Sequence, residues 1–175
     1  LAVKKGVTVI TDCGVAPGIS NLILGRMDQE YKIDSFTCYV GGIPKYPQPP
    51  FYYKAPFSPV DVVQEYLRPC IVREKGKVLT KEPLTERELI TFSALPEPLE
   101  AFITDGLRTL IHTMKHIPEL KEKTLRYKGH IELMLALKHS GLFSEKPVLF
   151  KGRKISPLEF TTKLLADQWK LGPEE

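Results

Sequence analysis

Residues 70–79 read CIVREKGKVL, and this run decides which fold class the sequence predicts. Its two halves contain apolar β-formers and flank Lys75-Gly76, a pair that favours a tight hairpin turn. A second hairpin is predicted over 147–155, around Lys151-Gly152. Because a hairpin pairs its strands antiparallel, the sequence predicts an α+β domain with a mixed or antiparallel sheet rather than a doubly wound parallel one.

Further elements are predicted on both sides of the first hairpin. Strands are expected over 6–11, 35–40, 87–95 and 124–127, and helices from Ile19, over 59–67, 107–114 and 130–139, and from Pro157 onward. A proline- and tyrosine-rich segment, 45–56, is expected to be an extended loop. Its aromatic residues favour a subunit contact in a homodimer, with a lid over a substrate or packing on the same domain as alternatives.

The bulk composition narrows the classes of function. The 175 residues carry a net charge of +4 that is spread along the chain, so no nucleic-acid partner is expected. Neither a bilayer-spanning apolar run nor the apolar core of a signal peptide is present in the sequence, so no membrane partner is expected either. The three cysteines are widely spaced, which favours a reducing cytoplasm and indicates neither a disulfide framework nor a metal site.

A glycine-bearing turn follows the first predicted strand. Gly14, Pro17 and Gly18 are typical of an ordinary tight turn, and also of a loop that brings backbone N–H groups to a ligand at a helix N-terminus. Asp12 at the start of this turn could accept a proton from a substrate amine, or it could cap the turn through hydrogen bonds to local amides.

Two glycines, Gly41 and Gly42, follow the predicted strand 35–40. Such a pair allows another backbone or a ligand to approach closely, and it also suits a β-bulge or a bend. Thr104 and Asp105 lie on a predicted turn, where they could bind a substrate ammonium group or cap the following helix.

Arg126, Tyr127 and His130 form the most reactive group of residue types in the chain. An arginine can hold a carboxylate by two parallel hydrogen bonds, and a histidine can exchange protons near neutral pH. Each of the three could instead take part in a surface salt bridge or cap the helix predicted over 130–139.

Four segments, taken in order, resemble the substrate domain of the saccharopine dehydrogenase family. They read GVTV and DCGVAPG at 6–9 and 12–18, YVGGIP at 39–44, PLEAF at 98–102 and TLRYKGH at 124–130. The first three are most similar to the lysine 6-dehydrogenase branch of that family. Ala16 stands where saccharopine reductases carry an aspartate, and this departure speaks against saccharopine formation.

The resemblance implies a fold like the C-terminal, substrate-binding domain of glyceraldehyde-3-phosphate dehydrogenase. It implies that 1–18 form the end of the last Rossmann strand and a connecting loop, and that 19–175 form a substrate-binding and dimerisation domain. The chain would then be an excerpt of a two-domain enzyme, and NAD or NADP would be bound mainly by the Rossmann domain, which carries the nucleotide fingerprint that this sequence lacks.

The residue chemistry and the resemblance together suggest roles for residues. Asp12 and His130 would be catalytic; Gly41, Gly42, Thr104, Asp105, Arg126 and Tyr127 would bind a small amino-acid substrate; Gly14, Val15, Pro17 and Gly18 would contact the cofactor. The implied reaction is NAD(P)-dependent oxidation of the amino-bearing side-chain carbon of L-lysine to the semialdehyde, with release of ammonia. A saccharopine- or carboxyspermidine-type reductase is one alternative, and a non-catalytic dimerisation or scaffold domain is another.

Overall fold

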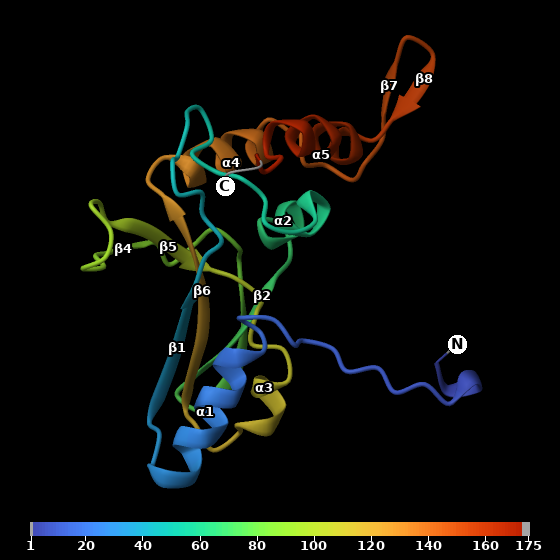
Figure 1. The fold of residues 1–175 in the computed structure, drawn as a ribbon. Coiled ribbons are helices and arrows are strands. Elements are labelled where there is room, and N and C mark those ends of the chain that lie inside the picture. The colour runs from blue at the N-terminus through green and yellow to red at the C-terminus, as the bar shows by residue number, and fades with distance from the viewer. Residues whose placement is uncertain (1, 173–175) are drawn as a thin grey trace.

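A mixed six-stranded sheet organises residues 2–172, the part of the chain that this computed structural model describes. The long strand β6 (Glu119–Tyr127) pairs in parallel with β1 (Ser35–Val40) and antiparallel with β5 (Leu99–Ile103). The path β3-β2-β6-β5-β4 is completed by β2 (Cys70–Glu74), β3 (Lys77–Lys81) and β4 (Glu88–Ile90). The predicted α+β class is confirmed (Figure 1). Leu1 and 173–175, the outer ends of the two predicted domain ranges, lie outside the described residues.

Both predicted hairpins are present. The first joins β2 to β3 through Lys75 and Gly76, which have φ values of 49° and 76°. The second joins β7 (Val148–Phe150) to β8 (Arg153–Ile155) through residues with almost the same φ values. Two successive positive φ angles match the right-handed twist of the flanking strands, which is why a glycine at the second turn position favours this hairpin. The ribbon β7–β8 projects from the body of the molecule (Figure 1).

Five α-helices pack around the sheet within the described residues. Helices α1 (Ile19–Glu30) and α3 (Leu110–Thr113) cover the lower part of the sheet, where Leu24 and Leu110 share an apolar cluster with Leu120 of β6. Helices α2 (Pro59–Glu65), α4 (His130–His139) and α5 (Pro157–Gln168) gather at the other end (Figure 1). Their common core includes Trp169, which contacts Phe51 and Tyr53 edge-on. The proline-rich loop is therefore packed on its own domain through these two rings.

Three elements predicted from the sequence are shorter than expected or absent. The strand expected over 87–95 is limited to β4, and the helix expected over 107–114 is limited to α3. The strand expected over 6–11 is absent: after the short 3-10 helix Val3–Lys5 the chain runs as an arm, with Val9 65% and Ile10 78% exposed. A strand needs a neighbour to accept its backbone hydrogen bonds, and within residues 2–172 this segment has none.

Candidate functional site

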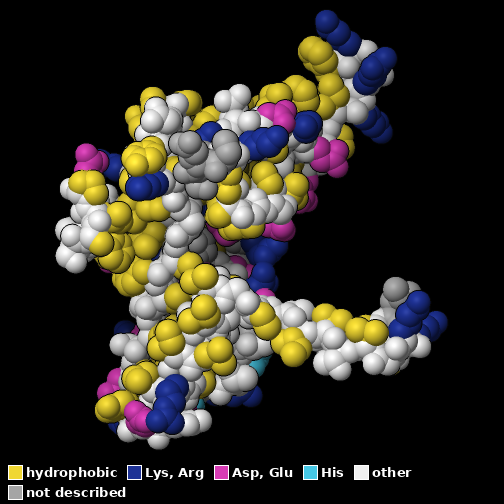
Figure 2. Space-filling view, in the orientation of Figure 1, with side chains coloured by type: hydrophobic (Ala, Val, Ile, Leu, Met, Phe, Trp, Pro, Cys, Tyr) yellow, Lys and Arg dark blue, Asp and Glu magenta, His cyan; other side chains and the backbone are white. Residues whose placement is uncertain are grey.

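A charged cavity of about 340 Å³ opens where β1 and β5 end, beside the middle of β6 and against helix α2. Its wall carries acidic and basic side chains together: Asp61, Glu65, Asp105 and Glu122, with Arg68, Arg108 and Arg126. Figure 2 shows such side chains gathered in the recess between the α2 end of the molecule and the N-terminal arm. A recess lined by both signs of charge suits a zwitterionic ligand.

The structure brings half of the predicted site residues to this cavity. Those that line it are Pro17, Gly41, Gly42, Thr104, Asp105 and Arg126. Those that do not are Asp12, Gly14, Val15, Gly18, Tyr127 and His130. The predicted substrate-binding residues other than Tyr127 thus converge from the ends of β1 and β5 and from β6, whereas neither of the two predicted catalytic residues reaches the cavity.

Arg126 lies deep in the wall, with 2% of its surface exposed. Its Nη2 forms an ion pair with Oε2 of Glu65 at 2.9 Å, its Nη1 donates to the carbonyl oxygen of Leu125, and its plane lies over the ring of Tyr53. Burial raises the pKa of the Glu65 carboxyl, and the Arg126 charge offsets that effect only in part. Arg126 therefore already holds one carboxylate of the protein, and it positions Glu65 at the cavity.

His130 is fully buried behind Arg126 rather than exposed to the cavity. Its Nδ1 lies 2.8 Å from the carbonyl oxygen of Phe51, which can only accept, so Nδ1 carries the proton and Nε2 is an acceptor. The Tyr66 hydroxyl, 2.9 Å from Nε2, must then donate to His130, while its oxygen accepts from Nε of Arg126 at 3.3 Å. Burial lowers the pKa of His130 to about 3, so its position argues against the predicted proton exchange near neutral pH.

Tyr127 and Asp12 also lie away from the cavity. Neighbouring residues on a strand point to opposite faces, so Tyr127 points away from the side occupied by Arg126, and its hydroxyl donates to the carbonyl oxygen of Pro44 at 3.1 Å. Asp12 is exposed on the N-terminal arm with a φ of 57°. Neither position brings the side chain to a ligand in this cavity.

The glycine-bearing turn forms a closed backbone structure before α1. The N–H of Gly14 donates to the carbonyl oxygen of Pro17 at 2.9 Å, and the N–H of Ile19 donates to the carbonyl oxygen of Gly14 at the same distance. A side chain at Gly18, where φ is 146°, would place its Cβ only 2.0 Å from that oxygen of Gly14. These hydrogen bonds favour the ordinary-turn interpretation, because they direct two of the amides into the turn.

Gly41 and Gly42 are explained by close protein contacts. A Cβ on Gly41 would lie 2.8 Å from the carbonyl oxygen of Leu125, and one on Gly42 would lie 2.4 Å from Cγ of Pro56. The close approach that the pair permits is thus made by the protein's own backbone and loop. Both residues still line the cavity, because the same bend ends β1 there.

Glu122 is the main residue that sequence reasoning missed. It is 6% exposed, lines the cavity and forms no side-chain hydrogen bond or ion pair with any residue in 2–172. Burial is the largest cause that raises its pKa to about 8; the charges of Glu65 and Asp105 add to the rise, and Arg108 opposes it. An isolated carboxyl that titrates near neutral pH in a cavity is a candidate for proton transfer.

Strand periodicity could have identified this residue. The prediction placed an extended segment only at 124–127, whereas β6 begins at Glu119. Counting back in steps of two from Arg126 along the true strand places Thr124 and Glu122 on the same face. Four other charges of the wall were also missed. Asp61, Glu65 and Arg68 lie on or just after α2, and Arg108 lies in the loop after β5. The contact of α2 with β6 depends on the tertiary fold.

The family model for the saccharopine dehydrogenase C-terminal domain matches residues 14–175. The chain belongs to the saccharopine dehydrogenase family. It is 31% identical over 159 residues to saccharopine dehydrogenase [NADP(+), L-glutamate-forming] of Saccharomyces cerevisiae, covering 82% of this chain and 34% of that protein. It is 25% identical to the mitochondrial alpha-aminoadipic semialdehyde synthase of Rattus norvegicus, covering 93% of this chain and 19% of that protein.

A solved structure of the family supports the same relationship. Apo saccharopine dehydrogenase (L-Glu forming) from Saccharomyces cerevisiae superposes with a TM-score of 0.64 at 25% sequence identity, over 83% of this chain and 35% of that chain. The chain therefore spans about a third of the length of this relative. Members of the family are oxidoreductases of amino-acid metabolism that act on carbon–nitrogen bonds and use NAD(P).

The described residues fit the substrate side of such an enzyme better than the nucleotide side. Where the turn before α1 reaches the cavity it offers Ala16 and Pro17, which have no polar side-chain atoms, and a proline has no N–H to donate to a phosphate. These residues could form an apolar wall for a flat ring and could not hold a pyrophosphate. Among residues 2–172 there is also no cluster of three His, Cys, Asp or Glu side chains that could hold a metal ion, and no helix long and apolar enough to cross a bilayer.

Proposed function

We propose that the chain is the substrate-binding domain of an NAD(P)-dependent dehydrogenase that oxidises the amino-bearing side-chain carbon of L-lysine to the semialdehyde and releases ammonia. The observation that supports this most is the cavity, because it presents free guanidinium groups and several carboxyl groups, of which that of Glu122 is buried, to one ligand. Lysine carries a carboxylate and two ammonium groups, and a site for it needs both kinds of partner.

The substrate carboxylate would bind to Arg68 and Arg108. Both line the cavity, are exposed, and form no ion pair within residues 2–172. Arg126 would act differently from the prediction, by holding Glu65 in place through its buried ion pair. The acidic groups Asp105 and Glu122 would receive the ammonium groups; Asp105 is fixed by a hydrogen bond from the backbone N–H of Ile71 to its Oδ1.

The cofactor would supply the hydride acceptor when bound. We propose that a neighbouring Rossmann domain holds its phosphates and that residues 19–175 close the substrate side of the cleft. The protein's contribution would be to orient the substrate carbon and to keep water out of the cleft while hydride leaves.

Saccharopine is the second candidate substrate. It is favoured by the 31% identity to the yeast enzyme named for it, and by the presence of three arginines around one cavity, since saccharopine carries more carboxylates than lysine does. Ala16, at the edge of the cavity, is the residue that argues for lysine instead.

A spectrophotometric assay of the full-length parent protein separates these candidates. Lysine and saccharopine are each supplied with NAD⁺ or NADP⁺, reduction is followed at 340 nm, and ammonia and glutamate are measured in the product. We expect reduction with lysine and release of ammonia. Glutamate release from saccharopine would establish the second candidate, and no reduction with either compound would favour a scaffold domain.

A further inference from the structure

We propose that Glu122 is the acid–base residue of this cavity, and that its carboxylate takes one proton from the side-chain ammonium group of the substrate before hydride departs. This inference rests on the proposed function and adds to it the residue that accepts the substrate proton. It replaces the two residues that the sequence suggested for catalysis, Asp12 and His130.

The position of Glu122 carries the argument. Its side chain leaves the middle of β6 on the cavity side and ends against Gly106, where an added Cβ would lie 1.5 Å from Oε1. Gly106 therefore makes the space that the carboxyl group occupies. With 6% of its surface exposed, the carboxyl is removed from bulk water yet lines the cavity, so it is placed to contact a bound ligand.

The other acidic groups of the cavity differ from Glu122 in their surroundings. Glu65 is bound to Arg126, and Asp105 accepts a backbone hydrogen bond from Ile71. Asp61 is exposed at the start of α2. Among these four carboxyls Glu122 is the one that is both buried and unpartnered, so a charge on a bound ligand can change its proton affinity most.

The charged groups around Glu122 come from several elements: Asp61, Glu65 and Arg68 from α2 and the residues after it, Asp105 and Arg108 from the loop after β5, and Arg126 from β6. The titratable thiols of Cys38 on β1, which pairs with Glu122, and of Cys70 on β2 also interact with it. Burial and the nearby Glu65 and Asp105 raise the pKa of Glu122 to about 8, and Arg108 opposes the rise. The carboxyl is therefore mostly protonated and neutral at pH 7 in the empty cavity. An ammonium ion that binds beside it adds positive charge, which lowers its pKa and releases its proton.

The proton transfer balances in the following way. The ionised Glu122 carboxylate accepts a proton from R–CH₂–NH₃⁺, which leaves R–CH₂–NH₂ and a neutral carboxylic acid. The nitrogen lone pair would then be free to form the C=N bond as hydride leaves the carbon, with NAD(P) as the hydride acceptor when bound, and the iminium ion R–CH=NH₂⁺ would result. Water converts this ion into the aldehyde and ammonium, and Glu122 returns its proton to solvent.

The experiment is isothermal titration calorimetry of L-lysine into the full-length protein with NAD(P)H present, so that binding occurs without turnover. Titrations at pH 7 in two buffers of different ionisation enthalpy give the number of protons released. We expect close to one proton per lysine from the wild type and none from Glu122→Gln. The matched control is Glu119→Gln, the same change at the half-buried start of the same strand, where the carboxyl accepts a hydrogen bond from the N–H of Lys75 and does not line the cavity; it should behave as the wild type does.

Kinetics supply the second readout. In the wild type, kcat/KM for lysine oxidation should rise with pH, with an apparent pKa near 8. In Glu122→Gln this pH dependence should be absent, and kcat should fall by about 100-fold or more. If Glu122→Gln does not fold, Gly106→Ala is the second test variant. The added Cβ would displace the Glu122 carboxyl, and the φ of residue 106 does not require glycine. This variant should lose both the pH dependence near 8 and the proton release.

The outcomes separate the two proposals. A Glu122→Gln protein that keeps the wild-type proton release and pH profile overturns the role of Glu122, even if lysine is the substrate. A wild type that releases no proton on binding lysine overturns it as well. A wild type that releases the proton but oxidises neither lysine nor saccharopine overturns the proposed function and leaves Glu122 as the residue that binds the amine.

Discussion

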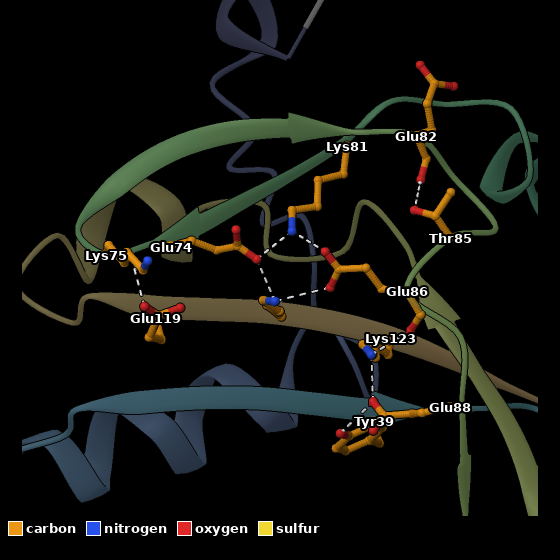
Figure 3. A network of polar contacts seen from close by, with 11 residues as sticks. Tyr39, Glu74, Lys75, Lys81, Glu82, Thr85, Glu86, Glu88, Glu119 and Lys123 are labelled. Carbon is orange, nitrogen blue, oxygen red and sulfur yellow. Dashed lines mark hydrogen bonds and ion pairs between the residues drawn. The ribbon is translucent and has the colours of Figure 1, made fainter.

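Charged residues are paired on one face of β6, whereas a carboxyl group on the other face is unpaired. On the face away from the cavity, Lys121 forms ion pairs with Glu74 and Glu86, and Lys81 joins the same two carboxylates (Figure 3). On the cavity face of the same strand, Glu122 has no such partner within residues 2–172. Since neighbouring residues on one strand alternate between the faces, this difference arises from the partners that each face offers.

The pKa values of two glutamates show what the difference means. Hydrogen bonds from Lys121 and Lys81 lower the pKa of Glu74 to about 2, whereas burial raises that of Glu122 to about 8. The carboxylate of Glu74 therefore stays ionised throughout the physiological range, while Glu122 titrates within it. Glu122 is therefore the carboxyl of this strand that costs stability when it is ionised, and it is the one to which the proton-transfer role is proposed.

The largest effect should come from breaking the ion pair that supports the cavity wall. Arg126→Met leaves Glu65 partly buried without its partner, so the free energy of unfolding should fall by about 3 kcal/mol and lysine binding should be lost. Urea denaturation and calorimetry measure the two effects. Adding Glu65→Gln should restore part of the stability, because no unpaired charge then remains in the wall. An Arg126→Met protein as stable as the wild type would contradict this account.

An effect of opposite sign, with a specific pH dependence, should come from Glu122→Gln. The pKa of Glu122 is higher in the folded than in the unfolded state, so the folded protein binds more protons between about pH 4.5 and 8, and wild-type stability falls as pH rises through that window. Glutamine does not titrate, and the variant should become more stable than the wild type, by an amount that grows up to about pH 8 and is then constant. Urea midpoints at pH 5 and pH 8.5 test this; equal differences at both pH values would contradict it.

The smallest effect should come from the paired face. Glu74→Gln removes one member of a partly exposed network in which Glu86 still faces both lysines, so it should cost less than about 1 kcal/mol at pH 7 and leave lysine oxidation unchanged. The pKa of Glu74 is lowered in the folded state, so its contribution is present above its unfolded pKa and is lost as pH falls toward 2. Denaturation at pH 7 and pH 2.5 should show the difference shrinking. A loss of activity in this variant would mean that the two faces are not independent.

The local pattern of apolar and polar residues was sufficient to predict the bounds of elements that have one more exposed and one more buried side. The strand expected over 35–40 and the helix expected over 130–139 have those bounds in the structure. Strand β5 was missed because all five of its residues are buried, so no alternation marks it. At 6–11 a strand was predicted that the structure does not form. β-branched residues favour an extended backbone, but a strand also needs a neighbouring strand, and the local sequence does not show whether one is present.

The residues of the candidate site also fall into two groups, those that the local sequence identified and those that it did not. Arg126, Asp105 and the two glycines after β1 were identifiable from residue type and position at the ends of elements. Glu122 was not, because it lies between two lysines in a run that looks solvated, and its burial depends on Gly106, which is distant in sequence. Burial of a charged side chain is a property of the tertiary fold, and one sequence does not display it.

The most direct test of the unpaired carboxyl is a ¹³C NMR titration of protein labelled at the glutamate side-chain carboxyl carbon, with the Glu122 signal assigned by its absence in Glu122→Gln. We expect a midpoint near pH 8 that moves to lower pH when L-lysine and NAD(P)H are added. A midpoint near the ordinary glutamate value, unchanged by lysine, would contradict the account.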